Sequence, residues 1–269
     1  MTGRFGMAVV ALVALAAASG CEEKKSSANV APAASSLAPS TPAPKSMTVK
    51  FTVDPTSTTS LLMEGPLEKI KARTEGAAGT LDVDLKDVTA SRGEVKIDLT
   101  TFTTSTFGDK SKEATQTTDA RTWLEVADGA DGKLDPKTKE QNRYAVYAIR
   151  AIENPSEADL TKIAPVKDGG DDVRTVTLTT KGELLVHGHK VERDADVEMQ
   201  LRYDPGAPPD KPKSLTVKTK KPFRVVIAEH DIKPRDSFGK IAKGAFHLLG
   251  TKVADNADVT LDLRAKPQS

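Results

Sequence analysis

The sequence has one cysteine, few aromatic residues and almost no net charge, and each shortage limits what the protein can be. Cys21 is the single cysteine among 269 residues, so no disulfide can form within the chain. Aromatic residues make up 4% of the total, so an internal site would have mainly aliphatic walls, which suit a long-chain lipid. A formal net charge of +1 argues against a nucleic-acid partner, because such a partner normally requires a basic stripe.

Sequence signatures of catalysis and metal binding are also missing. No Gly-x-Ser-x-Gly sequence occurs, and an enzyme acting on envelope lipids would need a Ser or Asp hydrogen-bonded to one of four histidines. His187 and His189 are two positions apart, but zinc needs three or four converging ligands, and the other histidines are distant in sequence. We therefore expect no metal, no cofactor and no enzymatic activity.

The N-terminal segment has the order of a secretory signal. Arg4 precedes the apolar run Met7–Ala18, which is too short to span a bilayer comfortably. Small residues then lead into Cys21, which resembles the lipobox of bacterial lipoproteins, although Ala18 stands where leucine is preferred. We predict a lipoprotein signal peptide at residues 1–20 and an acylated Cys21 as lipid anchor. An ordinary secretory signal with an incidental cysteine is the alternative.

Two further segments follow the signal. Residues 21–46 are rich in Ser, Ala and Pro and have too little hydrophobicity to pack, so we predict a disordered tether. From Met47 the composition changes, and residues 47–266 are expected to form one folded domain.

The stretch Lys181–Leu201 gives the clearest structural signal. In both of its arms apolar residues alternate with mostly polar ones, and this period of two is typical of strands. We expect a Gly188-His189 turn between the arms, in which Gly188 can take the positive φ that a tight hairpin requires. The hairpin therefore has one apolar face that needs a large interior. The residues of that face are Leu184, Val186, Ala195, Val197, Met199 and Leu201.

Similar alternation recurs along the domain. Besides the hairpin, strands are expected around residues 49–53, 81–85, 95–99, 144–152, 173–178, 215–217, 223–227 and 259–263. Residues 61–71 are expected to be a broken segment, because Gly65-Pro66 interrupts any regular element. About ten short strands with little helix favour an all-β sandwich or barrel, and we prefer an antiparallel barrel because closure removes exposed edges.

Three stretches depart from this pattern. We expect a helix from near Ser111 to before Gly129, a hydrophilic loop at Ala127–Arg143, and a mixed segment with some helical character at Asp236–Leu249. Trp123 in the helix and Phe238 in the mixed segment either dock these elements on the barrel or close a ligand tunnel.

Six blocks resemble the YceI-like family of bacterial envelope proteins, in the family's order. The hairpin GELLVHGHKVERDADVEMQL resembles its strand, Gly turn and long return strand. The other blocks are Val53–Ser57, Gly93–Phe102, Asp119–Leu124, Arg235–Gly239 and Val253–Leu263. Two stretches depart from the family: His189-Lys190-Val191 stands where it has Thr followed by Lys-Pro, and the Ala127–Arg143 insertion where it has Tyr/Phe-Pro. The resemblance covers roughly Met47 to Lys266.

The resemblance implies an extended lipocalin-like antiparallel β-barrel with a short helix near one end. It also implies an apolar tunnel that binds an isoprenoid chain, such as a polyprenol or a quinone, without catalysis. The expected tunnel-lining residues are Leu184, Val186, Ala195, Val197, Met199, Leu201, Trp123 and Phe238.

An envelope interaction or stress-protective protein with a filled core is the alternative, because strand alternation is the same around a cavity and around a packed core. If the barrel binds lipid, its partners are an isoprenoid-like lipid and a membrane. Acylated Cys21 would attach the protein to that membrane, on the periplasmic side of a bacterial envelope. Homodimerisation is left open.

Overall fold

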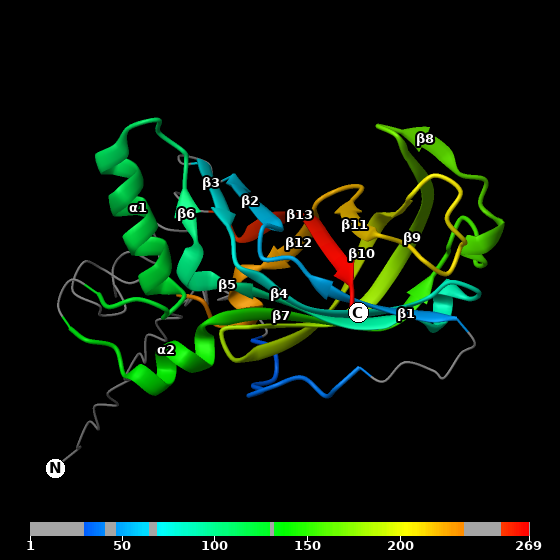
Figure 1. Cartoon of the computed structure of the whole chain (residues 1–269). Coiled ribbons are helices and arrows are strands. Elements are labelled where there is room, and N and C mark those ends of the chain that lie inside the picture. Colours follow the sequence, from blue (N-terminus) through cyan, green and yellow to red (C-terminus); the bar gives the residue numbers. More distant parts are fainter. Residues whose placement is uncertain (1–29, 41–46, 65–68, 130–131, 234–253, 269) are drawn as a thin grey trace, which may run out of the picture.

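The fold is a closed antiparallel barrel, as the strand pattern predicts. The computed structural model describes residues 30–40, 47–64, 69–129, 132–233 and 254–268. Within them, eight strands form a ring in the order β1-β4-β5-β7-β9-β10-β11-β13, and β13 returns to β1 (Figure 1). Their bounds are β1 Thr48–Val53, β4 Ala77–Asp84, β5 Arg92–Asp98, β7 Tyr144–Glu153, β9 Asp171–Val186, β10 His189–Tyr203, β11 Ser214–Thr219 and β13 Asn256–Pro267.

The barrel is extended at one end by shorter strands. The C-terminal half of β13 pairs with β11 and β1, and its N-terminal half pairs with β12 and β2. From β2 the sheet continues through β3 to β6, whereas β8 pairs with β9 elsewhere. The bounds of these strands are β2 Thr58–Glu64, β3 Lys69–Thr74, β6 Thr103–Thr104, β8 Val166–Asp168 and β12 Phe223–Val226.

Two sequence expectations change here. The described residues hold a thirteen-stranded sheet rather than about ten strands. The stretch expected as a broken segment forms the β2–β3 hairpin, because Pro66 falls in the connection 65–68 and removes no ladder hydrogen bond from either arm. That connection lies outside the described residues.

The β9–β10 hairpin follows its predicted alternation. Inward residues of β10 from Ala195 to Tyr203 are buried, and their neighbours are only partly so. His187 and Gly188 form the two-residue turn, each with a positive φ (50° and 74°), as a type I′ turn requires. The turn therefore lies one residue earlier than the expected Gly188-His189.

Two helices lie outside the barrel. The helix α1, Lys110–Trp123, begins after Asp109, whose carboxylate accepts hydrogen bonds from the amides of Ser111 and Lys112. It ends where Glu125 takes a φ of 56°, which is earlier than expected. The expected hydrophilic loop contains α2, Pro136–Asn142, capped by Asp135. In Figure 1, α1 stands beside β6 at the end of the barrel opposite β8.

Four 3-10 turns complete the described elements. Their bounds are η1 Val88–Ala90, η2 Leu99–Thr101, η3 Leu160–Lys162 and η4 Ile227–His230.

Residues 30–40, part of the predicted tether, lie against the barrel. The amide of Ala34 donates to the carbonyl of Gly188 (2.7 Å), and the amide of Lys190 donates to that of Pro32 (3.1 Å). Further along, Arg150 donates to the carbonyl of Ala38 (2.7 Å). None of its residues is buried, and its backbone pairs with groups that the hairpin tip leaves free.

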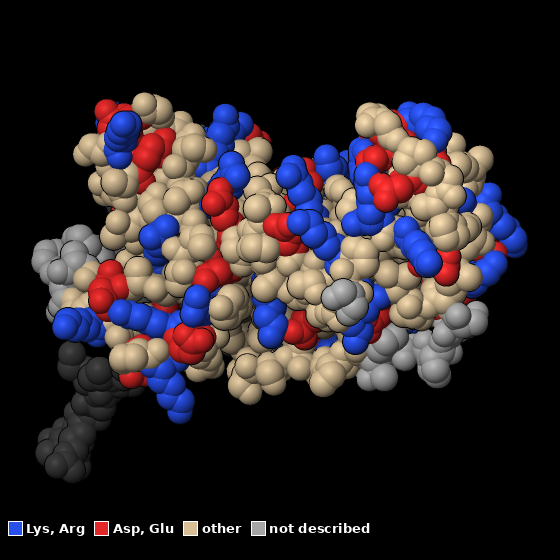
Figure 2. All heavy atoms as spheres, in the orientation of Figure 1, with Lys and Arg blue, Asp and Glu red and all other residues tan. Residues whose placement is uncertain are grey.

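The outer surface is mixed in charge. Figure 2 shows Lys and Arg side chains interspersed with Asp and Glu over the face in view, as the near-zero net charge suggests. Within the described ranges, no helix has both the length and the apolar character needed to cross a membrane.

Candidate functional site

A cavity of about 440 Å³ lies inside the barrel. Its walls come from two groups of buried apolar side chains. The group inside the closed ring, called the lower group, includes Leu81, Val95, Val197, Met199 and Leu263. The group towards the extended end, called the upper group, includes Met63, Ile70, Leu184, Val225 and Val259. The interior is thus an aliphatic space that continues from the ring into the extended end.

The hairpin supplies most of the lining that the sequence predicts. Five of its six candidates border the cavity: Leu184, Val186, Ala195, Val197 and Met199. The sixth, Leu201, is 1% exposed and packs in the lower group without bordering the cavity. The alternation along β10 turns Leu201 inward, where it belongs to the same packed group as Phe51 and Tyr203, which do not border the cavity either.

The end of α1 contributes a further part of the wall. Trp123 and Leu124 border the cavity. Hydrogen bonds to the strand side hold the helix there: Arg121 Nε donates to the carbonyl of Phe102 (2.8 Å), and the amide of Thr104 donates to Thr117 Oγ1 (3.0 Å). Docking and lining are therefore combined in one element. Phe238, Cys21 and the Asp236–Leu249 segment lie outside the described residues.

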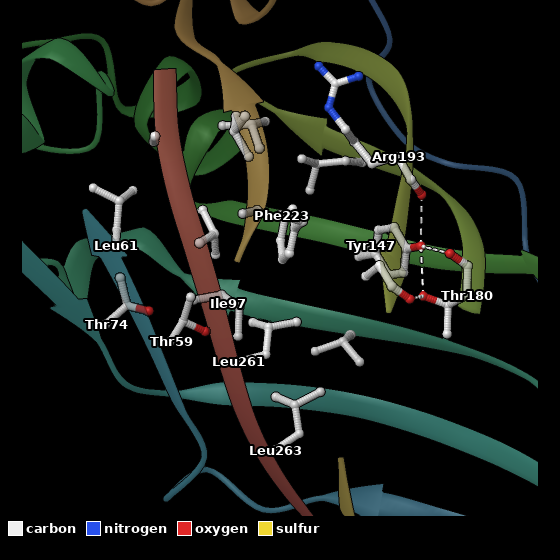
Figure 3. Close-up of a pocket in the computed structure, with 18 of the residues that line it drawn as sticks. Thr59, Leu61, Thr74, Ile97, Tyr147, Thr180, Arg193, Phe223, Leu261 and Leu263 are labelled. Atoms are coloured by element: carbon white, nitrogen blue, oxygen red, sulfur yellow. Dashed lines mark hydrogen bonds between the residues drawn. The ribbon is translucent and has the colours of Figure 1, made fainter. Parts of the chain in front are cut away.

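Tyr147 forms a polar contact in this wall that sequence reasoning missed. Its hydroxyl donates to the carbonyl of Arg193 (2.9 Å) and lies 3.1 Å from Thr180 Oγ1, as Figure 3 shows. Burial raises the pKa of Tyr147 to about 12, against the opposing effect of the hydrogen bond with Thr180, so the phenol is neutral. Gly182 makes room for the ring, because a Cβ there would lie 2.4 Å from Tyr147 Cζ.

Three charged residues that border the cavity have hydrogen-bond or ion-pair partners. Arg193 is paired with Glu229, and Asp194 lies 2.5 Å from Lys181 Nζ. The guanidinium of Arg92 donates to the carbonyls of Thr89 (2.9 Å) and Ser91 (2.6 Å). Arg193 is thus ion-paired, whereas the contacts of Arg92 are with neutral carbonyls.

Two threonine hydroxyls on the opposite wall have no partner. Thr59 and Thr74 are cross-strand neighbours on the inner face of the β2–β3 hairpin. Neither Oγ1 atom has a hydrogen-bond partner among the described residues, although both atoms are buried. In Figure 3 the two hydroxyls lie on the far side of Ile97 and Leu261 from Tyr147.

The His187-Gly188-His189 turn has a structural setting. His187 Nε2 lies 3.1 Å from Glu125, and its Nδ1 lies 3.0 Å from the carbonyl of His230. These contacts join the hairpin tip to Glu125, two residues after the end of α1, and to η4. Over the part of the chain that the structure describes, no three His, Cys, Asp or Glu side chains gather as metal ligands would.

Among known proteins, solved structures resemble the chain, whereas sequence comparisons find no match. No family model matches the chain, and no curated protein matches it either. Among solved structures, a polyisoprenoid-binding domain from Saccharophagus degradans implicated in plant cell wall breakdown is 12% identical, with a TM-score of 0.48. The match covers 82% of this chain and 99% of that domain. Burkholderia cenocepacia BcnA is 14% identical, with a TM-score of 0.44 over 80% of this chain and 99% of its own.

Both TM-scores lie below 0.5. Values this low assign no ligand or activity to the present chain. The extended antiparallel barrel with a helix at one end, which the YceI-like sequence blocks imply, is present in the structure itself. In architecture the domain is therefore similar to the lipocalin-like barrels of that family.

Proposed function

We propose that this protein binds an isoprenoid-type lipid, polyprenol-like or quinone-like, inside its barrel and performs no catalysis. The observation that carries the proposal is the aliphatic cavity of about 440 Å³. Ligand pockets in proteins commonly measure roughly 300–1,000 Å³ and are mostly apolar, with a few polar groups. The cavity has both properties.

The hydrophobic effect would drive such binding. Each buried CH₂ group contributes about 0.8 kcal/mol, whereas association costs about 4–15 kcal/mol. A ligand must therefore bury a chain of many carbons, and an isoprenoid does so. Met199 in the wall has a flexible thioether that can adapt to the branching methyl groups of such a chain.

The alternative, a protein with a filled core and no small ligand, fits this interior less well. Side chains such as Phe51 and Leu201 fill part of the ring, but the interior keeps a space that both apolar groups line. An empty apolar space of this size forfeits packing contacts, and a lipid would restore them.

The place of action is the second part of the proposal. The lipobox-like sequence at Cys21 supports a lipid-anchored protein on the periplasmic side of a bacterial envelope. Replacing the thiol in Cys21→Ser should release the protein from the membrane fraction, because its anchor would be lost. A variant that stayed membrane-bound as firmly as the wild type would overturn the anchor, though not the lipid binding.

Native mass spectrometry of protein purified from its own membranes tests the ligand. We expect a bound lipid at near-stoichiometric level, and organic extraction should release an isoprenoid. The matched control is Glu198→Gln, which changes an outward residue of β10 beside Val197 and should leave the lipid in place. Wild-type protein that carries no lipid, and takes none up when isoprenoids are added, would contradict the proposal.

A further inference from the structure

Thr59 and Thr74 interrupt an otherwise aliphatic inner face. The inward residues of β2 and β3 alternate regularly, and the others are Leu61, Met63, Ile70 and Ala72. The two threonines are paired across the strands, so their side chains stand next to each other. Thr74 is 5% exposed, and the Oγ1 atoms of both residues are buried without a partner in the described structure.

The pair lies where the two apolar groups of the interior meet. Thr59 is the cross-strand partner of Leu261 on its other side, and Leu261 packs against both groups. Figure 3 shows both hydroxyls on the side of β2 and β3 that faces Leu261 and Ile97. A ligand chain in either half of the cavity can therefore bring a polar group to them.

Folding alone does not account for these hydroxyls. Burying a hydroxyl without a hydrogen bond costs about 1–3 kcal/mol, and valine has nearly the same shape with no such cost. Valine also suits a strand well. The pair therefore has a role that the empty barrel does not fulfil.

We propose that Thr59 and Thr74 hold, by hydrogen bonds, an uncharged hydroxyl or carbonyl group of the bound lipid. The inference rests on the proposed function, since it names the part of the lipid that these residues contact. A threonine hydroxyl both donates and accepts, so a pair of them satisfies an alcohol, and each can donate to a carbonyl oxygen.

The neighbouring charges favour an uncharged group over a phosphate. A buried anion needs a cation that is free to pair with it. Every inward side chain of β2 and β3 that the structure describes is uncharged, and Arg193 on the opposite wall is already paired with Glu229. A diphosphate bound at the two threonines would therefore find no counter-ion on the strands that carry them.

The test compares three probes on delipidated full-length protein. They are geranylgeraniol, the isoprenoid hydrocarbon of the same chain length, and geranylgeranyl diphosphate. The variants are Thr59→Val, Thr74→Val and the double variant, with Thr74→Ser as the form that keeps a hydroxyl. Thr58→Val is the matched control, because Thr58 is the next residue of the same strand and does not border the cavity.

Loss of one hydrogen bond should weaken geranylgeraniol binding about fivefold in each single Val variant, and more than that in the double variant. Hydrocarbon binding should stay constant or improve, and Thr74→Ser and Thr58→Val should bind like the wild type. The double variant should also be at least as stable as the wild type without ligand, since it removes two unpaired buried hydroxyls.

The outcomes separate the two proposals. If the wild type binds none of the three probes, the lipid-binding function fails. If hydrocarbon and alcohol both bind, and the double variant keeps full affinity for the alcohol, the pair holds only water and this inference fails alone. Tightest binding of the diphosphate, unaffected by the Val variants, would also overturn it.

Discussion

Two hairpins face each other across the cavity, and they are built differently. The β9–β10 hairpin has arms of 16 and 15 residues, and β7 and β11 pair along its two outer edges. Its inward residues are mainly aliphatic, and the hydroxyl of Thr180 is hydrogen-bonded to Tyr147. The β2–β3 hairpin has arms of 7 and 6 residues, and its inner face ends in two unpaired hydroxyls.

The difference separates stability from recognition. The β9–β10 hairpin is the long wall of the cavity, and its many aliphatic side chains hold the barrel together. The hydroxyls of Tyr147 and Thr180 in this wall are hydrogen-bonded before a ligand arrives, although Arg193 Nε is buried without a partner among the described residues. The β2–β3 hairpin is the short wall, and the hydroxyls of Thr59 and Thr74 gain hydrogen bonds only when a ligand or water enters the cavity. Substitutions in the first wall should therefore act mainly on folding, and substitutions in the second mainly on ligand choice.

The largest effect is expected from Val197→Asp in the long wall. Val197 is 4% exposed and borders the cavity, so the new carboxylate would be buried without a partner. We expect the free energy of unfolding to fall by about 3 kcal/mol or more, with loss of lipid retention. Denaturant unfolding and native mass spectrometry measure the two effects. A variant that folds and keeps its lipid at the wild-type level would show that this face does not line the binding space.

Gly182→Ala should break the same wall less severely. The added Cβ would lie 2.4 Å from the Tyr147 ring, which must then move away from Thr180 and Arg193. Overpacking of this kind costs about 1–3 kcal/mol.

A double-mutant cycle with Tyr147→Ala isolates this clash, because the small side chain removes it and the two costs should not add. Additive costs would mean that the ring does not depend on Gly182.

Alternation predicts the long wall well but cannot assign the interior. The period of two places Val197, Met199 and Leu201 on one face, yet only the first two border the cavity. Parity reports which way a side chain points. How far the neighbouring strands fill the space depends on the pairing between β1 and β13, which closes the barrel. These two strands come from opposite ends of the domain's sequence.

One other feature had a sequence signal that was missed, and two had no sequence signal. Asp135-Pro136 is a helix start, and it marks α2 within the expected loop. The contact between Tyr147 and Gly182 depends on the register between β7 and β9, where a bulge shifts the pairing after Ile149. The unpaired state of Thr59 is visible only when all of its neighbours are known. Such properties arise from tertiary packing and leave no local pattern.

Acid should loosen the long wall at its tip. His230 is fully buried, and its Nδ1 lies 3.1 Å from the carbonyl of His189 in β10. Burial lowers the pKa of His230, and Arg193 acts in the same direction, whereas two backbone hydrogen bonds and Glu229 oppose them. With a lowered pKa the unfolded chain binds more protons, so stability should fall as the pH drops below about 6.5.

The slope that one proton can contribute is at most about 1.4 kcal/mol per pH unit. Urea unfolding across this range, compared between the wild type and His230→Asn, measures the contribution of this histidine. The variant should have a flatter pH dependence, since its amide can donate a similar hydrogen bond without titrating. Equal slopes in the two proteins would assign the acid sensitivity to another group.

The smallest effect is expected from Tyr147→Phe, and it sharpens the contrast between the walls most directly. The ring still fits against Gly182, and Thr180 Oγ1 keeps a contact with the carbonyl of Ala195 at 3.3 Å. Loss of the bond to the Arg193 carbonyl should cost about 1 kcal/mol of unfolding free energy. Geranylgeraniol affinity should not change, because this phenol already has partners. If Tyr147→Phe weakened alcohol binding as strongly as Thr74→Val, the polar group of the lipid would lie on the long wall, and the division of roles between the hairpins would be reversed.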